Sequence, residues 1–464
     1  MFELLKDKSF YKRTLRILLP VAAQQLISIG VSTADSLMIG SFGEVQISAT
    51  SLANSLMTLF FFMFMGLGTG STTLAAQFWG KKDRDSLRAI CGIALRIAFC
   101  LGVAFSLLAL LAPGGVMRFM TNDERIIEKG ISYLRILGFI FPFSALATAS
   151  TYLLRSTGHT KMPLLGSIGA FFINIFFNWV FIFGKLGAPR MEIAGAALGT
   201  LIARIFEFCM SFGYLIVFDK NIRMRFKDIF IRNAEIFKKF MKFSLPVVFS
   251  DTMLGLGLNL QNVIVGHMGD NLIAARSVVF VLSQFVTIFN MGLSSAAGVV
   301  IGNTIGERKP ERAFKEGVAY IVISIAIGIV GMVFVLSLSP YFVNIKAYNF
   351  SETTRSIARE LFLCISVTMP LQTLAYVTSK GILRGAGDTR FIALADILLL
   401  WVVSLPLGAL TGFVLHWRPF WMYFFLTIEY PLKGIWCTLR FLSGKSIKDV
   451  TKKSESETLA TDTV

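Results

Sequence analysis

The sequence predicts an all-α integral membrane protein of about twelve transmembrane helices, in two six-helix lobes related by a pseudo-two-fold axis along the membrane normal. Three observations lead to this fold class. The 464 residues are 55% hydrophobic and only 16% charged, with a mean hydropathy of +0.68. Apolar stretches of roughly 20 residues or more recur along the whole chain. The two halves of the sequence also resemble each other.

Each apolar stretch is long enough to cross a hydrocarbon layer of roughly 30 Å at about 1.5 Å per helical residue. Helices are predicted because lipid leaves the backbone no other partners except in a closed barrel. A barrel is excluded because its strands would be about ten residues long and would alternate apolar with polar residues. The predicted spans are residues 14–40, 47–78, 90–112, 130–154, 162–184, 193–217, 243–266, 272–305, 316–341, 358–382, 391–414 and 419–440.

The formal net charge of +17 is unevenly distributed between the predicted loops. Most of the 45 Lys and Arg residues lie in the N-terminus, the even-numbered loops and the C-terminus, for example Lys81 and Lys82. By the positive-inside rule, this pattern predicts a multi-pass protein of the cell (plasma) membrane with both termini cytoplasmic. Nucleic-acid binding is not expected, because no basic stripe is interleaved with stacking aromatic residues. The excess charge is expected to contact lipid headgroups.

An internal repeat supports two homologous halves. One gap-free offset superposes Pro20 on Pro246, Gly40 on Gly266 and Gly80 on Gly306. A second block, at a slightly larger offset, superposes Leu154-Arg155 on Leu383-Arg384 and Gly158 on Gly387. The offset crosses an even number of spans, so both halves are expected to have the same orientation in the membrane.

This repeat divides the chain into four predicted parts. Residues 1–217 form the N-lobe, 218–242 a cytoplasmic linker, 243–442 the C-lobe and 443–464 a disordered cytoplasmic tail. The linker mixes basic residues with apolar ones such as Phe226 and Phe230, and either lies on the membrane surface as an amphipathic segment or is solvated. The tail is rich in Ser, Thr, Lys and Glu, which is typical of disorder.

Several motifs in the correct order resemble the multidrug and toxic compound extrusion (MATE) transporters. The motifs are Asp35-Ser-Leu-Met-Ile-Gly40, Gly80-Lys-Lys-Asp83, Leu154-Arg-Ser-Thr-Gly158, Asn174-Ile-Phe-Phe-Asn178, Gly195-Ala-Ala-Leu-Gly-Thr200 and Leu383-Arg-Gly-Ala-Gly-Asp-Thr-Arg390. They cover nearly the whole chain. The resemblance implies export of small organic cations or amphipathic drugs by rocking of two lobes, driven by inward flow of H⁺ or Na⁺.

Asp35 is the first candidate for ion coupling. An ionisable side chain at membrane depth costs roughly 2.5–3.5 kcal/mol on insertion scales, so it is a functional candidate by default. Asn174 and Asn178 lie one helical turn apart and share a helix face. The resemblance implies that these three residues form a cation or proton site in the N-lobe, although one branch of the family has aspartate where this chain has Asn178. The alternatives are that Asp35 snorkels to the outer interface and that the two amides hydrogen-bond neighbouring helices.

Asp251, Asp396 and Glu429 are weaker candidates, assigned to the substrate cavity because they also fall within predicted spans. The sodium-coupled branch of the family has acids deep in helices seven and ten, and this chain has none between Leu361 and Lys380. That difference argues against sodium coupling in the C-lobe.

A flippase for a lipid-linked or other amphipathic substrate is the main alternative, and it would require arginines such as Arg96 and Arg276 to converge on one cavity. An enzyme is not predicted, because no acid/base or metal-ligand cluster is visible at membrane depth. Accordingly, we expect no metal and no cofactor besides the coupling ion. We also expect the protein to be a monomer.

Overall fold

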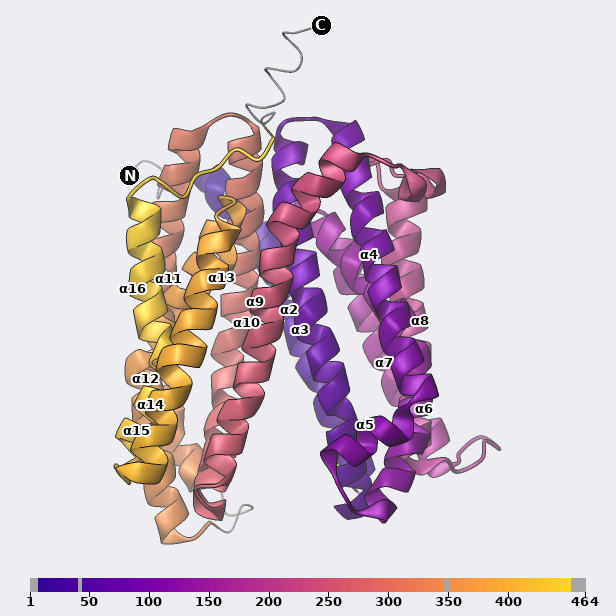
Figure 1. Ribbon diagram of the computed structural model, residues 1–464, viewed down its shortest axis with the longest axis vertical. Coiled ribbons are helices and arrows are strands. Elements are labelled where there is room, and N and C mark those ends of the chain that lie inside the picture. Colours follow the sequence, from indigo (N-terminus) through magenta and orange to yellow (C-terminus); the bar gives the residue numbers. More distant parts are fainter. Residues whose placement is uncertain (1–6, 41–43, 345–349, 452–464) are drawn as a thin grey trace, which may run out of the picture.

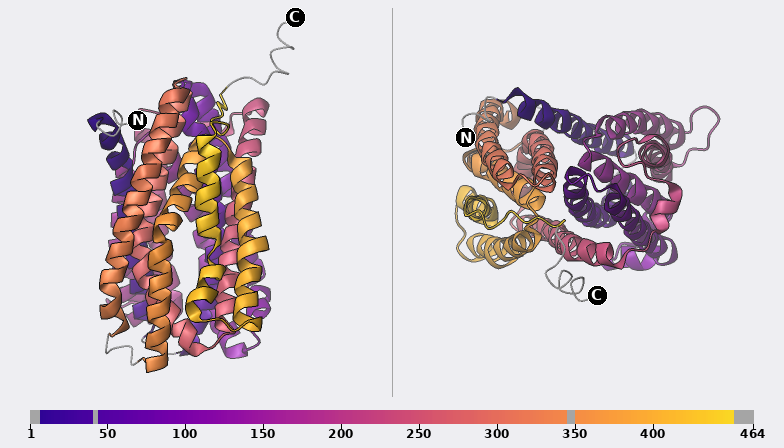
Figure 2. Two further views of the ribbon diagram at one scale, coloured as in Figure 1. Left: turned by 90° about the vertical axis from the view of Figure 1, so that its left-hand side faces the viewer. Right: turned by 90° about the horizontal axis from the view of Figure 1, so that it is seen from above.

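The computed structural model describes residues 7–40, 44–344 and 350–451, and this part of the chain is helical without strands (Figure 1). The helices run side by side along the long axis of the molecule. The first helix begins and the last helix ends at one end of the bundle, here called the terminal end, and the opposite end is called the far end (Figures 1 and 2). This architecture is the predicted all-α membrane fold class.

The first half contains seven α-helices and a π-helical extension: α2 (Lys8–Gly40), α3 (Glu44–Gly80), α4 (Arg84–Leu111), the short α5 (Pro113–Met120), α6 (Glu124–Ser156), α7 (Lys161–Phe183), α8 (Glu192–Gly213) and η1 (Tyr214–Phe218). The 3₁₀ turn η2 (Phe226–Phe230) lies in the connection to the second half. Six of these helices are long and apolar enough to span a membrane.

The second half contains α9 (Ala234–Gly266), α10 (Asp270–Gly306), α11 (Pro310–Val343), α12 (Glu352–Tyr376) with η4 (Val377–Leu383), α13 (Thr389–Ile397) with η5 (Leu398–Ser404), α14 (Leu405–Ala409) and η6 (Leu410–Val414), then α15 (Pro419–Leu426) and α16 (Glu429–Leu442). Eleven candidate spans result for the described part of the chain. The predicted twelfth span, 419–440, is interrupted between α15 and α16 by a turn at Thr427 and Ile428.

Reciprocal packing relates the two halves. A Cβ built on Gly66 would lie 2.7 Å from the backbone of Val248, and a Cβ on Gly292 would lie 3.4 Å from the Cβ of Ala22. The repeat superposes Gly66 on Gly292 and Ala22 on Val248, so the same contact occurs twice with the halves exchanged. Such an isologous pattern is the signature of a two-fold axis. Consistently, α2 packs on α10 while α3 packs on α9, and α2 and α9 lie on opposite sides of the molecule (Figure 2).

The same exchange closes the terminal end. A Cβ built on Gly80 of α3 would lie 2.1 Å from the carbonyl oxygen of Asn303, and one on Gly306 of α10 would lie 1.9 Å from the carbonyl oxygen of Gln77. Neither space can hold a methyl group, so glycine is required for this approach. The two groups of helices are therefore in close contact at the terminal end, and they diverge toward the far end (Figure 1).

Two predicted boundaries need correction. Helix α9 begins at Ala234, within the predicted 218–242 linker, because Asn233 caps its first turn by accepting from the backbone N–H of Ile236. The predicted tail, 443–464, is ordered as far as residue 451. Within it, the backbone N–H of Val450 donates to Gln77, 3.0 Å away, and the backbone oxygen of Lys448 accepts from the Gln77 amide. Residues 452–464 lie outside the described part.

Candidate functional site

Asp35, Asn174 and Asn178 come together in the N-terminal half. The Nδ2 group of Asn178 donates to Asp35 Oδ1 at 2.5 Å and to Asn174 Oδ1 at 3.2 Å. Asn174 in turn donates to the hydroxyl of Thr200 at 3.2 Å. Both asparagines are buried, so the carboxylate on α2 faces two neutral amides on α7. The predicted helix face is thus directed at Asp35, as it would need to be for an ion site.

Helix α8 supports this cluster from behind through a glycine. A Cβ built on Gly199 would lie 2.2 Å from Asn178 Oδ1, so only glycine leaves room for the amide. Asn178 Oδ1 is buried and has no hydrogen-bond partner among the described residues. Asn178 Oδ1 therefore packs against the backbone of α8, and the Asp35 carboxylate is the group of this cluster that can bind a proton or a cation.

Asp35 borders a cavity of about 650 Å³ that lies between α2, α3, α6 and α8. Thr50, Asn54 and Arg204 line the same cavity. Arg204 binds Glu207 at 2.5 Å, which is the structural pair expected for residues three apart on a helix. Asp35 thus faces a polar hollow within the N-terminal half instead of pointing outward to the membrane surface.

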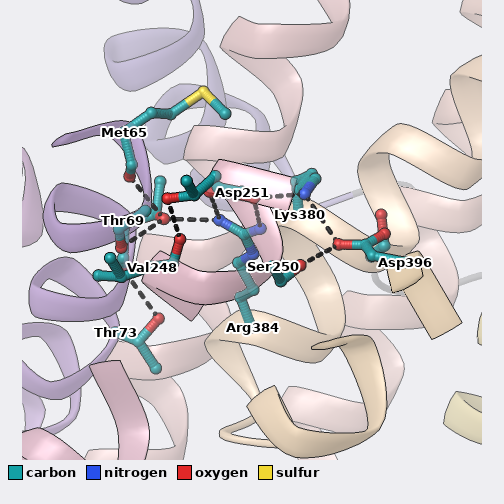
Figure 3. A network of polar contacts seen from close by, with 12 residues as sticks. Met65, Thr69, Thr73, Val248, Ser250, Asp251, Lys380, Arg384 and Asp396 are labelled. Atoms are coloured by element: carbon teal, nitrogen blue, oxygen red, sulfur yellow. Dashed lines mark hydrogen bonds and ion pairs between the residues drawn. The ribbon is translucent and has the colours of Figure 1, made fainter. Parts of the chain in front are cut away.

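A second, larger cluster of charges lies in the C-terminal half (Figure 3). Asp251 on α9 accepts from both guanidinium nitrogens of Arg384, at 2.9 and 2.5 Å, and from Lys380 at 2.5 Å. Lys380 also contacts Asp396 on α13 at 3.0 Å. Lys380 is in η4, and π-helical turns within α-helices are frequent at functional sites.

Two further charges complete this cluster. Lys433 on α16 binds the other oxygen of Asp396 at 2.9 Å. Glu429, one turn earlier on α16, is fully buried, and neither of its carboxyl oxygens has a hydrogen-bond partner in the part of the chain that the structure describes.

The acids predicted to line a substrate cavity are thus placed differently from that expectation. Asp251, Asp396 and Glu429 are 0%, 2% and 0% exposed and lie behind the basic side chains. Lys380 and Arg384 are the charged residues of this cluster that line the central cavity. Lys380 and Lys433 were not among the predicted site residues, although buried basic residues at membrane depth are as costly as acids and give the same signal in the sequence.

The central cavity lies between the two halves and has a volume of about 60 Å³. Helices α2 and α3 contribute Gln25 and Thr69, and Arg155 of α6 joins them from the first half. Arg384 donates to the Thr69 hydroxyl at 2.6 Å, which connects the second half to the first across this cavity. Within the described residues, no group of three or more His, Cys, Asp and Glu could hold a metal ion.

The chain is similar to known proteins over most of its length. The MatE family model matches residues 20–180 and 246–427, which is most of the chain and falls into two segments. The uncharacterized transporter YisQ of Bacillus subtilis (strain 168) is 22% identical over 434 residues, covering 93% of this chain and 90% of that protein. The probable multidrug resistance protein YoeA of the same organism is 26% identical, covering 78% of this chain and 79% of that protein.

A solved structure shows the same fold. The crystal structure of MATE in complex with MaL6 superposes with a TM-score of 0.84, covering 96% of this chain and 98% of that one at 19% sequence identity. The likeness therefore shows the fold over nearly the whole chain.

Proposed function

The chain belongs to the MatE family, and on that premise we propose that it is a secondary active efflux transporter, which exports amphipathic organic compounds in exchange for H⁺ or Na⁺. One observation carries the proposal. Asp35 is an acid at membrane depth whose carboxylate faces neutral amides and a large polar hollow. A carboxylate in such surroundings can exchange a proton or a cation with the solution that reaches the hollow.

In this proposal, Asp35 binds the coupling ion, and Asn178 holds the ionised Asp35 carboxylate in place. When Asp35 is ionised, the Asn178 amide donates to it, as in the observed contact. When Asp35 takes up a proton or cation, its attraction for the amide weakens and α2 is released from α7. Because α2 also packs on α10 of the other half, movement of α2 would be felt at the boundary between the halves.

The shape of the molecule supports alternating access. The halves are held together at the terminal end by the contacts of Gly80 and Gly306 and diverge toward the far end. With the termini in the cytoplasm, as the distribution of Lys and Arg predicts, this conformation opens to the outside. Rocking of the halves about α2 and α9 would open the terminal end instead.

Arg96 and Arg276, which a flippase would need to bring to one cavity, have separate partners. Arg96 donates to the backbone oxygen of Ile231 in the connection between the halves, at 2.9 Å. Arg276 donates to Asn262, near the far end, at 2.6 Å. The two arginines therefore do not converge on one cavity.

The test is transport in proteoliposomes of a fluorescent amphipathic compound, with proton and sodium gradients imposed separately. Export driven by one of the two gradients is expected. Asp35→Asn retains shape and hydrogen bonding but removes the charge, so gradient-driven export should be lost while protein yield stays normal. Asp85→Asn, at an exposed acid, is the matched control. Wild-type export by Asp35→Asn would show that the coupling site is elsewhere, and Asp251 would be the next residue to test.

A further inference from the structure

The central cavity between the halves is lined by three basic side chains. They are Arg155 from the first half and Lys380 and Arg384 from the second. No acid is among the residues that line this cavity. A cavity lined by charges of one sign favours a ligand of the opposite charge, unless the lining charges already have counter-ions.

Two of the three are neutralised. Arg384 makes a bidentate pair with Asp251, and Lys380 lies between Asp251 and Asp396. Buried charges are tolerated in proteins when they are paired in this way. These two side chains therefore need no further anion.

Arg155 has no such partner. Its side chain is 7% exposed, and it donates to the neutral oxygen of Gln24. Its Nε is buried without a hydrogen-bond partner, and no acid lies within ion-pair distance of it among the described residues. The acid on the facing helix α8, Glu207, is bound by Arg204 and accepts from Ser167. Arg155 is thus a buried charge without a directly bonded counter-ion, and Glu207, the acid that lines a cavity with it, is already bound by Arg204.

The internal repeat shows where the counter-ion is missing. Arg155 and Arg384 are equivalent in the two halves, and the position equivalent to Asp251 is Gln25. The second half therefore supplies its own carboxylate to its arginine, and the first half supplies a neutral amide that lines the cavity. Since an unpaired buried charge is costly, a ligand that brings the anion would gain the interaction that Asp251 supplies on the other side.

Apolar surface adjoins this charge. A cavity of about 930 Å³ between α2, α7 and α10 is lined by Leu26, Phe171, Phe280 and Phe285. A third cavity contains both Arg155 and Phe171 and so connects the two. Exposed Leu26 and Phe280 at the apolar cavity suit a hydrocarbon body.

We propose that the substrate is an amphipathic organic anion, whose carboxylate, sulfonate or phosphate group binds Arg155 while its apolar part occupies the cleft between α2 and α10. This inference rests on the proposed efflux function and narrows its substrate class. The sequence predicted cationic or amphipathic substrates, and the charges of the cavity select amphipathic compounds that carry a negative group.

The experiment measures equilibrium binding to the full-length protein in nanodiscs, using two radiolabelled probes of equal chain length and opposite charge, laurate and dodecyltrimethylammonium. Laurate should bind more tightly. Arg155→Gln should lower laurate affinity about 10-fold to 100-fold, the size of one charge-assisted hydrogen bond, and Arg155→Lys should restore part of it. Arg359→Gln, at an exposed arginine, is the control and should bind like wild type.

A second variant keeps the test independent of any folding defect in the first. Gln25→Glu gives the first half the acid that the second half has, so it should abolish laurate binding and improve binding of the cationic probe. Competition by dilauroyl phosphatidylglycerol but not by the matching phosphatidylcholine would identify a lipid headgroup as the anion. Lack of competition by either would identify a non-lipid amphipathic anion.

The proposal is overturned if dodecyltrimethylammonium binds wild type more tightly than laurate, or if folded Arg155→Gln and Gln25→Glu both bind laurate normally. Efflux could still be correct in that case, because the proteoliposome assay tests it separately. Laurate binding that depends on Arg155, without gradient-driven transport of any probe, would instead contradict the efflux function and leave this binding site standing.

Discussion

Gly306 offers the sharpest test of how the two halves move. Its built Cβ would lie 1.9 Å from the carbonyl oxygen of Gln77, and the reciprocal Cβ of Gly80 would lie 2.1 Å from that of Asn303. Contacts of this kind occur only while the terminal end is closed. Gly306→Ala should therefore destabilise the observed conformation and leave a conformation with an open terminal end unaffected.

The magnitude follows from the overlap. The methyl carbon of an alanine at 306 would need to lie about 1 Å or more farther from the Gln77 carbonyl oxygen than the structure allows. That oxygen belongs to the backbone, so it cannot rotate away as a side chain could. Overpacking of this kind costs typically 1–3 kcal/mol. Because the cost applies to one conformation only, the population ratio should change by roughly 5-fold to 150-fold against the closed terminal end.

The assay is a spin-label distance across the far end. Phe119→Cys in α5 and Tyr341→Cys in α11 place labels on exposed sites of the two halves, in a background where the exposed Cys100 and Cys209 are Ser. In Gly306→Ala the distribution should shift to shorter distances, because opening the terminal end brings the far ends together.

The repeat supplies a matched control for this substitution. A Cβ on Gly266, or on its equivalent Gly40, meets nothing within 4 Å. Gly266→Ala should therefore leave the distance distribution unchanged. A folded Gly306→Ala protein with the wild-type distribution would refute the reasoning, because the glycine contact would then not depend on the access state.

Three further predictions follow from the charges and the packing. Asp251→Asn leaves Arg384 buried without its counter-ion and should lower the free energy of unfolding by roughly 3–5 kcal/mol, measured by SDS titration. An unchanged unfolding midpoint would contradict the ion-pair assignment. Gly199→Ala should displace the Asn178 amide and slow gradient-driven export, and Asn178→Ala should also slow it, although less than loss of the titrating acid does. Gly213→Ala, with open space around its Cβ, is the control. Equal export rates in Gly199→Ala and Gly213→Ala would count against the site. A reporter fused after residue 464 should be cytoplasmic, and an external signal would overturn the predicted topology.

Much of this protein could be predicted from local properties of its sequence. Hydropathy and span length determine the membrane class, because transfer of each segment into lipid depends mainly on its own composition. The repeat predicts paired halves, and the reciprocal contacts of Gly66 and Gly292 follow from it. The spacing of Asn174 and Asn178 predicts a shared helix face, because helical periodicity is fixed by backbone geometry. What that face meets, Asp35, came from family resemblance.

Only the tertiary structure decided which charges have partners. Asp251 and Arg384 lie on different helices, and whether they meet depends on helix rotation, depth and the π-helical turn before Arg384, none of which is encoded by spacing along the chain. The same applies to Arg155. Its equivalent in the repeat, Arg384, is paired with a carboxylate, whereas Arg155 has no carboxylate bonded to it. Hydrophobicity is a property of each segment, whereas an ion pair requires two segments to be positioned within a few ångströms of each other, and that is settled by packing.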